Sequence, residues 1–131
     1  MAIKAQLTGS GAAGGLAVAI TGVPDTTVSG AGTTHSDCTL LPLKPIIWVK
    51  TAANNSGVII PPGNGSGDGM TPGDSMWVYN GDSNTLLLYP PLLGTLNDGT
   101  ATTGTVSIPT KTSVEIICLS STNYLVSGPT T

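Results

Sequence analysis

An internal repeat constrains the fold of this 131-residue chain more than any other feature of its sequence. Residues 48–62 read WVKTAANNSGVIIPP and residues 77–91 read WVYNGDSNTLLLYPP, so the two segments align without a gap. Together they hold both tryptophans and both Pro-Pro pairs of the chain. Each segment places a polar, turn-forming centre between two apolar runs, and Asn80-Gly81 is a strong hairpin signal. Because an internal repeat usually reports architecture, we predict two similar β-hairpins.

The rest of the sequence also favours strands over helices. Apart from Ala and Leu, good helix formers are nearly missing, because the chain has one Glu, one Gln and no Arg. Thr, Val and Ile, which suit a half-buried pleated surface, are instead the residues expected to form the ordered structure. Further apolar runs at 105–108, 113–121 and 124–126 predict three closing strands. We therefore predict an all-β fold, a small β-sandwich or barrel of about seven to nine strands.

The first part of the chain differs from the remainder in composition. Residues 1–36 contain no aromatic residue and only two charged ones. In two short runs, apolar residues alternate with small or polar ones, at Ile3, Leu7, Leu16, Val18 and Ile20. We predict an extended Gly/Ala/Thr-rich N-terminal arm over residues 1–36 and a β-domain over residues 37–131. Two such short strands have little apolar area of their own, so they need a sheet to join, in this subunit or in a neighbour.

The low charge of the chain narrows the choice of partners. Charged residues make up 8% of the sequence, against about a quarter in an ordinary soluble domain. Two explanations fit: a surface rich in Thr and Ser, or a surface that is covered in an assembly, since interface cores shed charge. With four lysines and no arginine there is no basic stripe to bind nucleic acid. No apolar run approaches the roughly 20 residues of a membrane span, and no secretory signal is recognisable, so we expect synthesis in the cytoplasm.

Few residues offer chemistry, and we predict neither an enzyme nor a metal or cofactor site. His35 is the one histidine, and it lies beside Asp37 and Cys38 in a polar loop, whereas the members of a catalytic triad come from different elements. A metal site would need further ligands. The Gly-rich loop at 63–73 lacks the Glu that a calcium loop requires at its twelfth position. With no secretory signal, Cys38 and Cys118 are predicted to be buried free thiols.

The aromatic residues of the two repeat segments leave two interpretations open. Trp48, Trp77, Tyr79 and Tyr89 could form a platform on which sugars stack. Because Trp48 and Trp77 occupy matched positions in the repeat, they are also suited to be core residues or anchors of an interface.

Three segments resemble a β-rich module of structural virion proteins of tailed bacteriophages. They are WVYNGDSNTLLLYPP from Trp77, GTLNDGTA from Gly94 and SVEIICLSSTNY from Ser113. Such proteins include capsid decoration (cement) proteins and head or tail fibre proteins, and the resemblance covers about 50 residues, which is less than half of the chain. It implies a homotrimer on the outer capsid surface of the virion, with the major capsid protein as partner, often bound through extended N-terminal segments.

Two functions are therefore expected. The first is a capsid decoration protein that stabilises a phage head. The alternative is a fibre or receptor-binding module that recognises host surface glycans. For the first, the residues expected at the capsid or trimer interface are Ile3, Leu7, Leu16, Val18, Ile20, Trp48, Trp77 and Tyr89.

Overall fold

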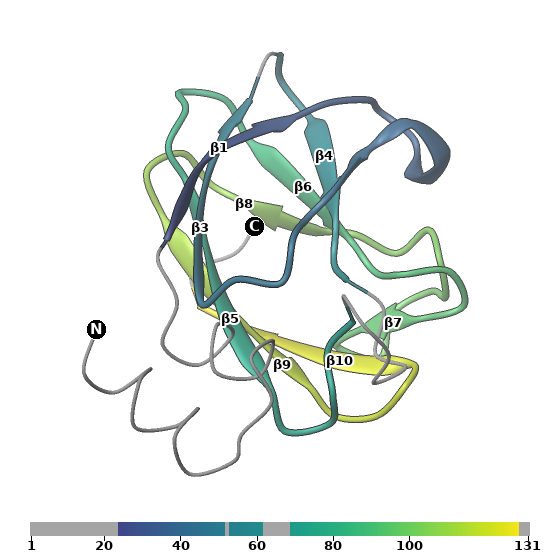
Figure 1. Ribbon diagram of the computed structural model, residues 1–131. Helices are drawn as coiled ribbons and strands as arrows, with labels where there is room; N and C mark the ends of the chain where they lie inside the picture. Colours follow the sequence, from purple (N-terminus) through teal and green to yellow (C-terminus); the bar gives the residue numbers. More distant parts are fainter. Residues whose placement is uncertain (1–23, 52, 62–68, 129–131) are drawn as a thin grey trace, which may run out of the picture.

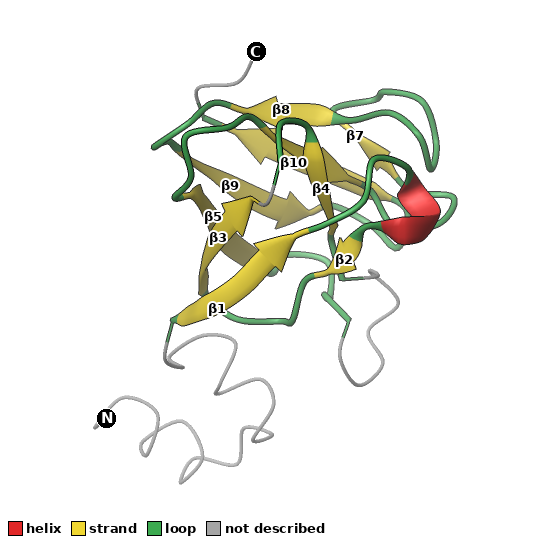
Figure 2. Cartoon of the chain, turned by 90° about the horizontal axis from the view of Figure 1, so that it is seen from above, coloured by secondary structure: helices red, strands yellow, loops and turns green. Residues whose placement is uncertain are grey.

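Two β-sheets build the part of the chain that the computed structural model describes, residues 24–51, 53–61 and 69–128 (Figures 1 and 2). The six-stranded sheet has the order β1-β3-β5-β9-β10-β7, and the four-stranded sheet has the order β2-β4-β6-β8. The predicted all-β class is confirmed, with ten strands among the described residues. The elements are β1 (Asp25–Gly30), the 3-10 turn η1 (His35–Asp37), β2 (Thr39–Leu40), β3 (Ile46–Thr51), β4 (Ser56–Ile59), β5 (Ser75–Asn80), β6 (Leu86–Tyr89), β7 (Thr95–Leu96), β8 (Val106–Ile108), β9 (Ser113–Cys118) and β10 (Asn123–Ser127).

Each repeat segment forms an arch between the two sheets, so the prediction of hairpins is wrong. β3 and β5 lie in the six-stranded sheet, whereas β4 and β6 lie in the four-stranded sheet. The two strands of one segment therefore belong to different sheets and share no backbone ladder. Turn residues permit the same bend whether the chain returns in the same sheet or crosses to the facing one. Local sequence therefore does not separate an arch from a hairpin.

In the structure, the internal repeat corresponds to two arches that stack on each other. β5 pairs with β3 in parallel and β6 pairs with β4 in parallel, so the second arch lies on the first. Ile46 is opposite Trp77, and Trp48 is opposite Tyr79, two residues beyond the position that the sequence alignment gives it. Since side chains alternate along a strand, a shift of two residues leaves both tryptophans on the same face of the sheet.

The stack continues on both sides of the two repeat segments. β1 pairs with β3 in parallel and β2 pairs with β4 in parallel, which makes a third arch. On the other side, β9 pairs with β5 and β8 pairs with β6, both antiparallel. β10 and then β7 extend the six-stranded sheet beyond β9.

The core lies between the two sheets and follows the alternation of each strand. In β5, Met76 and Val78 are buried, while Ser75 and Trp77 point outward and are exposed. β9 alternates between buried and half-buried residues. A single cluster of buried side chains receives residues from both sheets, among them Ile47, Val78, Leu86, Leu88, Ile108 and Ile116.

A buried asparagine fixes the bend after β5. The side chain of Asn80 is fully buried, and its Nδ2 donates to the carbonyl oxygens of Asn84 at 2.7 Å and of Ile108 at 3.0 Å. Its Oδ1 accepts from the backbone N–H of Asp82 at 3.2 Å. The predicted hairpin signal Asn80-Gly81 thus marks a bend that is tied by its side chain to the end of β8.

Part of the predicted arm belongs to the β-domain. Residues 25–30 form β1, and Val28 packs in the core. The sequence did not predict this strand, because its first residues, Asp25, Thr26 and Thr27, show no alternation of apolar and polar side chains. The predicted strands at residues 3–7 and 16–20 lie outside the described residues.

Candidate functional site

The outward side chains of four neighbouring strands form an apolar surface on the six-stranded sheet. Ile46, Trp48, Trp77 and Leu125 are 46%, 44%, 44% and 40% exposed, respectively. Tyr79 and Ile117 are half-buried between them. Trp48 is opposite Tyr79, and Ile117 is opposite Leu125, so the residues adjoin across the strands. We call this surface the outer face and define it as Ile46, Trp48, Trp77, Tyr79, Ile117 and Leu125.

Trp48 is held against its neighbours by contacts on two sides. Its ring meets that of Tyr79 edge-on, with centroids 4.9 Å apart and planes at 77°. It also lies directly over Gly81, because a Cβ at that position would come within 1.8 Å of the indole Nε1. Only glycine permits this approach of the indole to the backbone. A ring fixed in this way loses little conformational entropy when a partner covers its exposed part.

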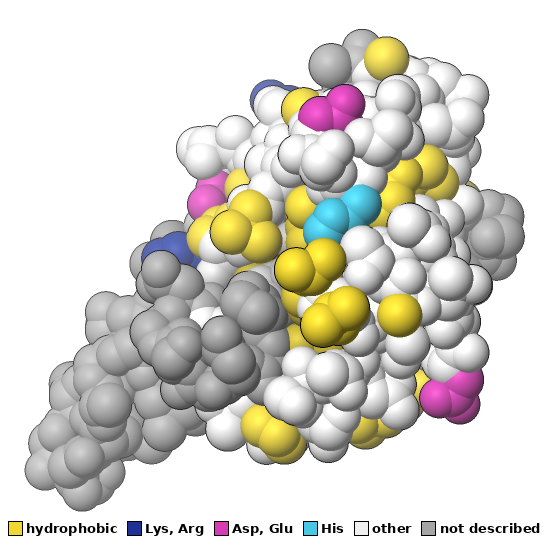
Figure 3. Space-filling model, turned by 90° about the vertical axis from the view of Figure 1, so that its right-hand side faces the viewer, with side chains coloured by type: hydrophobic (Ala, Val, Ile, Leu, Met, Phe, Trp, Pro, Cys, Tyr) yellow, Lys and Arg dark blue, Asp and Glu magenta, His cyan; other side chains and the backbone are white. Residues whose placement is uncertain are grey.

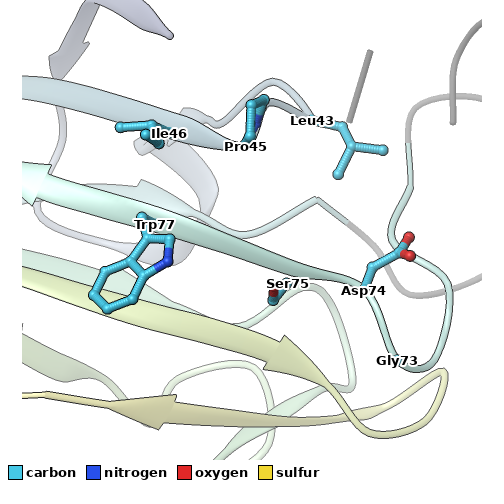
Figure 4. A pocket seen from close by; sticks show the side chains of 7 residues that line it. All are labelled: Leu43, Pro45, Ile46, Gly73, Asp74, Ser75 and Trp77. Carbon is cyan, nitrogen blue, oxygen red and sulfur yellow. The ribbon is translucent and has the colours of Figure 1, made fainter. Parts of the chain in front are cut away.

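A pocket of about 420 Å³ adjoins the outer face where β3 and β5 begin (Figure 4). Ile46 and Trp77 form part of its wall. Asp74 lies at one end of the pocket, just before β5. It is linked there to β9, because its carbonyl oxygen accepts from the N–H of Cys118 at 2.9 Å. The Asp74 carboxylate accepts from the N–H of Thr71 at 2.9 Å. The lining residues are Leu43, Pro45, Ile46, Gly73, Asp74, Ser75 and Trp77.

Few charges accompany the outer face. Glu115 is half-buried in the row that contains Ile46 and Trp77. Lys50 is exposed further along β3. The outer face and the pocket are therefore mainly apolar. At the end of the sheet where β3 and β5 begin, the acids Glu115 and Asp74 are accompanied by Lys44, whose charge helps to lower the pKa of Asp25.

His35 lies on another side of the molecule, where hydrophobic side chains gather around it (Figure 3). Its Nε2 is 3.0 Å from the carbonyl oxygen of Pro90, an acceptor, so this nitrogen carries the proton. The ring meets that of Tyr89 edge-on, with centroids 6.0 Å apart. Leu92 and Leu93 follow Pro90 closely in sequence and are 72% and 69% exposed. The contacts of His35 thus attach the loop around η1 to the end of β6.

The carboxylate of Asp37, in the same loop as His35, accepts hydrogen bonds from backbone N–H groups. Asp37 Oδ1 accepts from the N–H of Thr34 at 2.9 Å and from the N–H of Thr33 at 3.2 Å. These bonds, led by that from Thr34, lower the pKa of the carboxyl. The His35 ring is directed at Pro90 and not at Asp37, so the two groups act as structural partners of different segments.

Both cysteines are free thiols, as predicted, but the prediction that both are buried is wrong for Cys38. Cys118 is buried, whereas Cys38 is half-buried and its Sγ donates to the carbonyl oxygen of Thr34 at 2.9 Å. Burial raises the pKa of both thiols, and the charges of Asp37 beside Cys38 and of Asp74 beside Cys118 raise it further. A thiol with a raised pKa stays protonated at neutral pH and is a poor nucleophile.

The predicted site residues do not all come together. Trp48 and Trp77 lie on the outer face, whereas Tyr89 lies in the four-stranded sheet, is 6% exposed, and donates through its hydroxyl to the carbonyl of Thr33 at 3.1 Å. Ile3, Leu7, Leu16, Val18 and Ile20 lie outside the described residues. Sequence reasoning missed Ile46 and Leu125, although strand alternation places Ile46 on the same face as Trp48.

Comparison of the chain with protein-family models, with curated proteins and with solved structures found no match. Among the described residues, no group of three or more His, Cys, Asp or Glu side chains is placed to hold a metal ion. The same residues form no helix of the length and hydropathy that crossing a membrane requires.

Proposed function

We propose that this chain is a structural virion protein, a decoration protein that binds the outer surface of a phage capsid as a homotrimer and stabilises it. The observation that carries the proposal is the outer face. It presents two tryptophans, an isoleucine and a leucine, each at least 40% exposed, on one side of a rigid sheet. Large exposed apolar groups gathered on one surface mark a site of protein–protein contact.

The chemistry of the outer face suits a protein partner. Tryptophan is enriched among the residues that dominate binding energy, and interface cores contain few charges. Trp48 is already fixed by Tyr79 and Gly81, so a partner that covers it would order little further. The assignment to a capsid and the expectation of a trimer both rest on the resemblance of residues 77–124 to virion proteins.

Many copies on a capsid lattice make modest contacts sufficient. A trimer that binds through three equal surfaces engages the second and third intramolecularly, so its avidity exceeds the affinity of one surface. A decoration protein of this kind uses contact area on the shell and needs no catalytic group. The low charge of the chain fits surfaces that are covered in the assembly.

The alternative function, recognition of host glycans, is favoured by a specific observation. Trp77 is 44% exposed beside a pocket that also presents the Asp74 carboxylate and the Ser75 hydroxyl. An aromatic face beside hydrogen-bonding groups is a chemistry that binds sugars. This function would use the same surface for a different ligand.

Co-sedimentation separates the two functions. Purified protein is mixed either with empty capsids assembled from the cognate major capsid protein or with host cells. The decoration function predicts saturable pelleting with capsids and none with cells. Pelleting with cells alone, accompanied by quenching of tryptophan fluorescence by cell-surface glycans, would establish the alternative. Sedimentation equilibrium of the free protein tests the trimer, and a monomer at all concentrations would contradict it.

The role of the arm needs a truncation that spares the sheet. Deleting residues 2–30 would remove β1 and the core residue Val28. Deleting residues 2–23 leaves every described strand in place. We expect this shorter deletion to weaken capsid binding while the circular dichroism of the β-domain is kept. Unchanged capsid binding would show that the arm makes no contact with the shell.

A further inference from the structure

A carboxylate lies within the outer face without a base beside it. Glu115 is half-buried in β9, and its cross-strand neighbours are Trp77 on β5 and Ser127 on β10. Along β9 its outward neighbours are Ser113 and Ile117. None of these four side chains is basic, and no hydrogen bond or ion pair joins the carboxylate to another residue that the structure describes. A protein partner that covers the outer face therefore covers an acid that needs a counter-charge.

The indole of Trp77 lies beside this carboxylate. Trp77 and Glu115 are directly opposite each other on antiparallel strands, which places their Cβ atoms about 5 Å apart. Figure 4 shows the Trp77 ring extending toward β9, the strand that carries Glu115. Trp77 is also 44% exposed, so a partner can reach its ring. A cation that sits on this indole is attracted both by the ring and by the carboxylate.

The pocket adjoins Trp77 on the side away from Glu115 and has room for a second side chain. It lies toward β3, where Leu43, Pro45 and Ile46 give it an apolar wall. Such a wall suits an aliphatic side chain next to the cation. Asp74 contributes a further carboxylate to the pocket, so the cation meets negative charge on both sides of the indole.

The charge at this end of the sheet is negative on balance. Three acids lie there, Asp25, Asp74 and Glu115, together with the base Lys44. Hydrogen bonds from Thr27 lower the pKa of Asp25, and the charge of Lys44 lowers it further, so Lys44 acts on the β1 side of the sheet. The strand that follows Lys44 is two strand spacings, about 10 Å, from β9. Lys44 therefore leaves the Glu115 charge for a partner to neutralise.

Arginine matches this site better than lysine does. Its planar guanidinium stacks on an indole and donates two parallel N–H groups to one carboxylate. Arginine is also enriched, with tryptophan, among the residues that dominate binding energy at interfaces. The 131-residue sequence contains no arginine, so a second copy of it does not supply this group.

We propose that the protein partner of the outer face inserts an arginine side chain that stacks on Trp77 and pairs with Glu115, while an aliphatic residue next to that arginine fills the pocket. This inference deepens the proposed function and rests on it, because it takes the outer face as the contact surface. The capsid protein must then present an arginine beside an aliphatic residue. Trp48 is opposite Tyr79 on β5 and takes no part in binding the cation.

Peptide titration of the full-length protein tests the inference without a capsid. The probes are an acetylated Leu-Arg-Leu amide and the same peptide with citrulline, which keeps the planar shape of arginine and removes its charge. NMR follows the indole N–H signals of Trp77 and Trp48. We expect the arginine peptide to bind at least about tenfold more tightly than the citrulline peptide. It should shift the Trp77 signal more than the Trp48 signal, and its affinity should fall as salt is added.

Two variants with the same change in net charge locate the contact. Glu115→Gln removes the counter-charge and keeps the shape of the side chain. Asp98→Asn is the matched control, because Asp98 is exposed and follows the edge strand β7. We expect Glu115→Gln to lose most of the preference for the arginine peptide and Asp98→Asn to keep it. Circular dichroism checks that both variants fold.

Several results of the titration would overturn the inference. They are equal affinities of the two peptides for the natural chain, no binding of either peptide, and equal losses of preference in Glu115→Gln and Asp98→Asn. Tighter binding of the corresponding lysine peptide would also contradict it, because the guanidinium would then have no special role.

Capsid co-sedimentation of Glu115→Gln separates this inference from the proposed function. We expect the variant to bind capsids at least about tenfold more weakly than the natural chain does. If both proteins pellet equally well, the decoration function stands and the arginine contact is wrong. If the arginine peptide binds as expected but the natural chain does not pellet with capsids, the arginine site stands and the decoration function fails.

Discussion

At the scale of single residues, the fold depends on a few polar groups that are buried with partners. Asn80 is the clearest case, since its amide ties the bend after β5 to the carbonyl oxygens of Asn84 and Ile108. Loss of one partner leaves buried acceptors unpaired, and each such group costs about 1–3 kcal/mol. The energetic weight of this residue could not be deduced from a sequence in which Asn80-Gly81 indicated a surface turn.

We therefore expect Asn80→Ala to lower the free energy of unfolding by about 2–3 kcal/mol. The matched control is Asn84→Ala, because Asn84 contributes its backbone carbonyl to this network and the substitution keeps that group. Urea denaturation followed by circular dichroism measures both variants. Equal losses in the two would show that the Asn80 amide has no special role.

The buried thiol of Cys118 gives a prediction for how the free energy of unfolding depends on pH. Burial raises the pKa of Cys118, so the folded state disfavours the thiolate. The stability linked to this group is fully present below the pKa of an unfolded thiol and is lost as the pH rises through the folded pKa. Between pH 7 and pH 10 the natural chain should therefore lose more unfolding free energy than Cys118→Ala does. A parallel pH dependence in urea denaturation would contradict the burial of this thiol.

At the scale of elements, alternation is the part of the fold that the sequence predicts well. The apolar starts of the repeat segments 48–62 and 77–91 lie in β3 and β5, and the run predicted at 113–121 became β9. In β3 and β5 one face is buried and the other is mostly exposed, and in β9 buried residues alternate with half-buried ones. The inner face was visible in the sequence because strand side chains alternate with a period of two.

Two neighbouring isoleucines in β3 test this alternation. Ile47 is fully buried, whereas Ile46 is 46% exposed on the outer face. Ile47→Ala should cost about 2–5 kcal/mol through lost burial and a cavity. Ile46→Ala should cost less than about 1 kcal/mol. Thermal and urea unfolding measure both, and similar losses would mean that the assignment of the two faces is wrong.

Three elements could not be predicted, each for a physical reason. β1 begins with polar residues and owes its place to pairing with β3, which is distant in sequence. β2 and β7 contain two residues each, too few to show a period. The choice between hairpin and arch depends on which sheet the returning strand joins, and turn residues carry no information on that. The two tryptophans of the candidate site were found because the repeat marked them.

At the scale of the whole molecule, the edge strands of the sheets limit how far the stack of arches can extend. Parallel arches could in principle continue into a solenoid. Here β1 is capped by Asp25 and Thr39, and β2 and β7 are short. Blunted edges direct association to the faces of the sheets. The outer face is therefore the surface on which we expect assembly to depend.

Capsid co-sedimentation of two surface variants tests this central claim most directly. One variant carries Trp48→Ser and Trp77→Ser on the outer face. The control carries Leu92→Ser and Leu93→Ser, two exposed leucines near β7 at the far edge of the same sheet. The account predicts that the tryptophan variant binds at least about tenfold more weakly than the natural chain, while the leucine variant binds as the natural chain does. Equal binding by all three proteins, or loss of binding in the leucine variant alone, would contradict it.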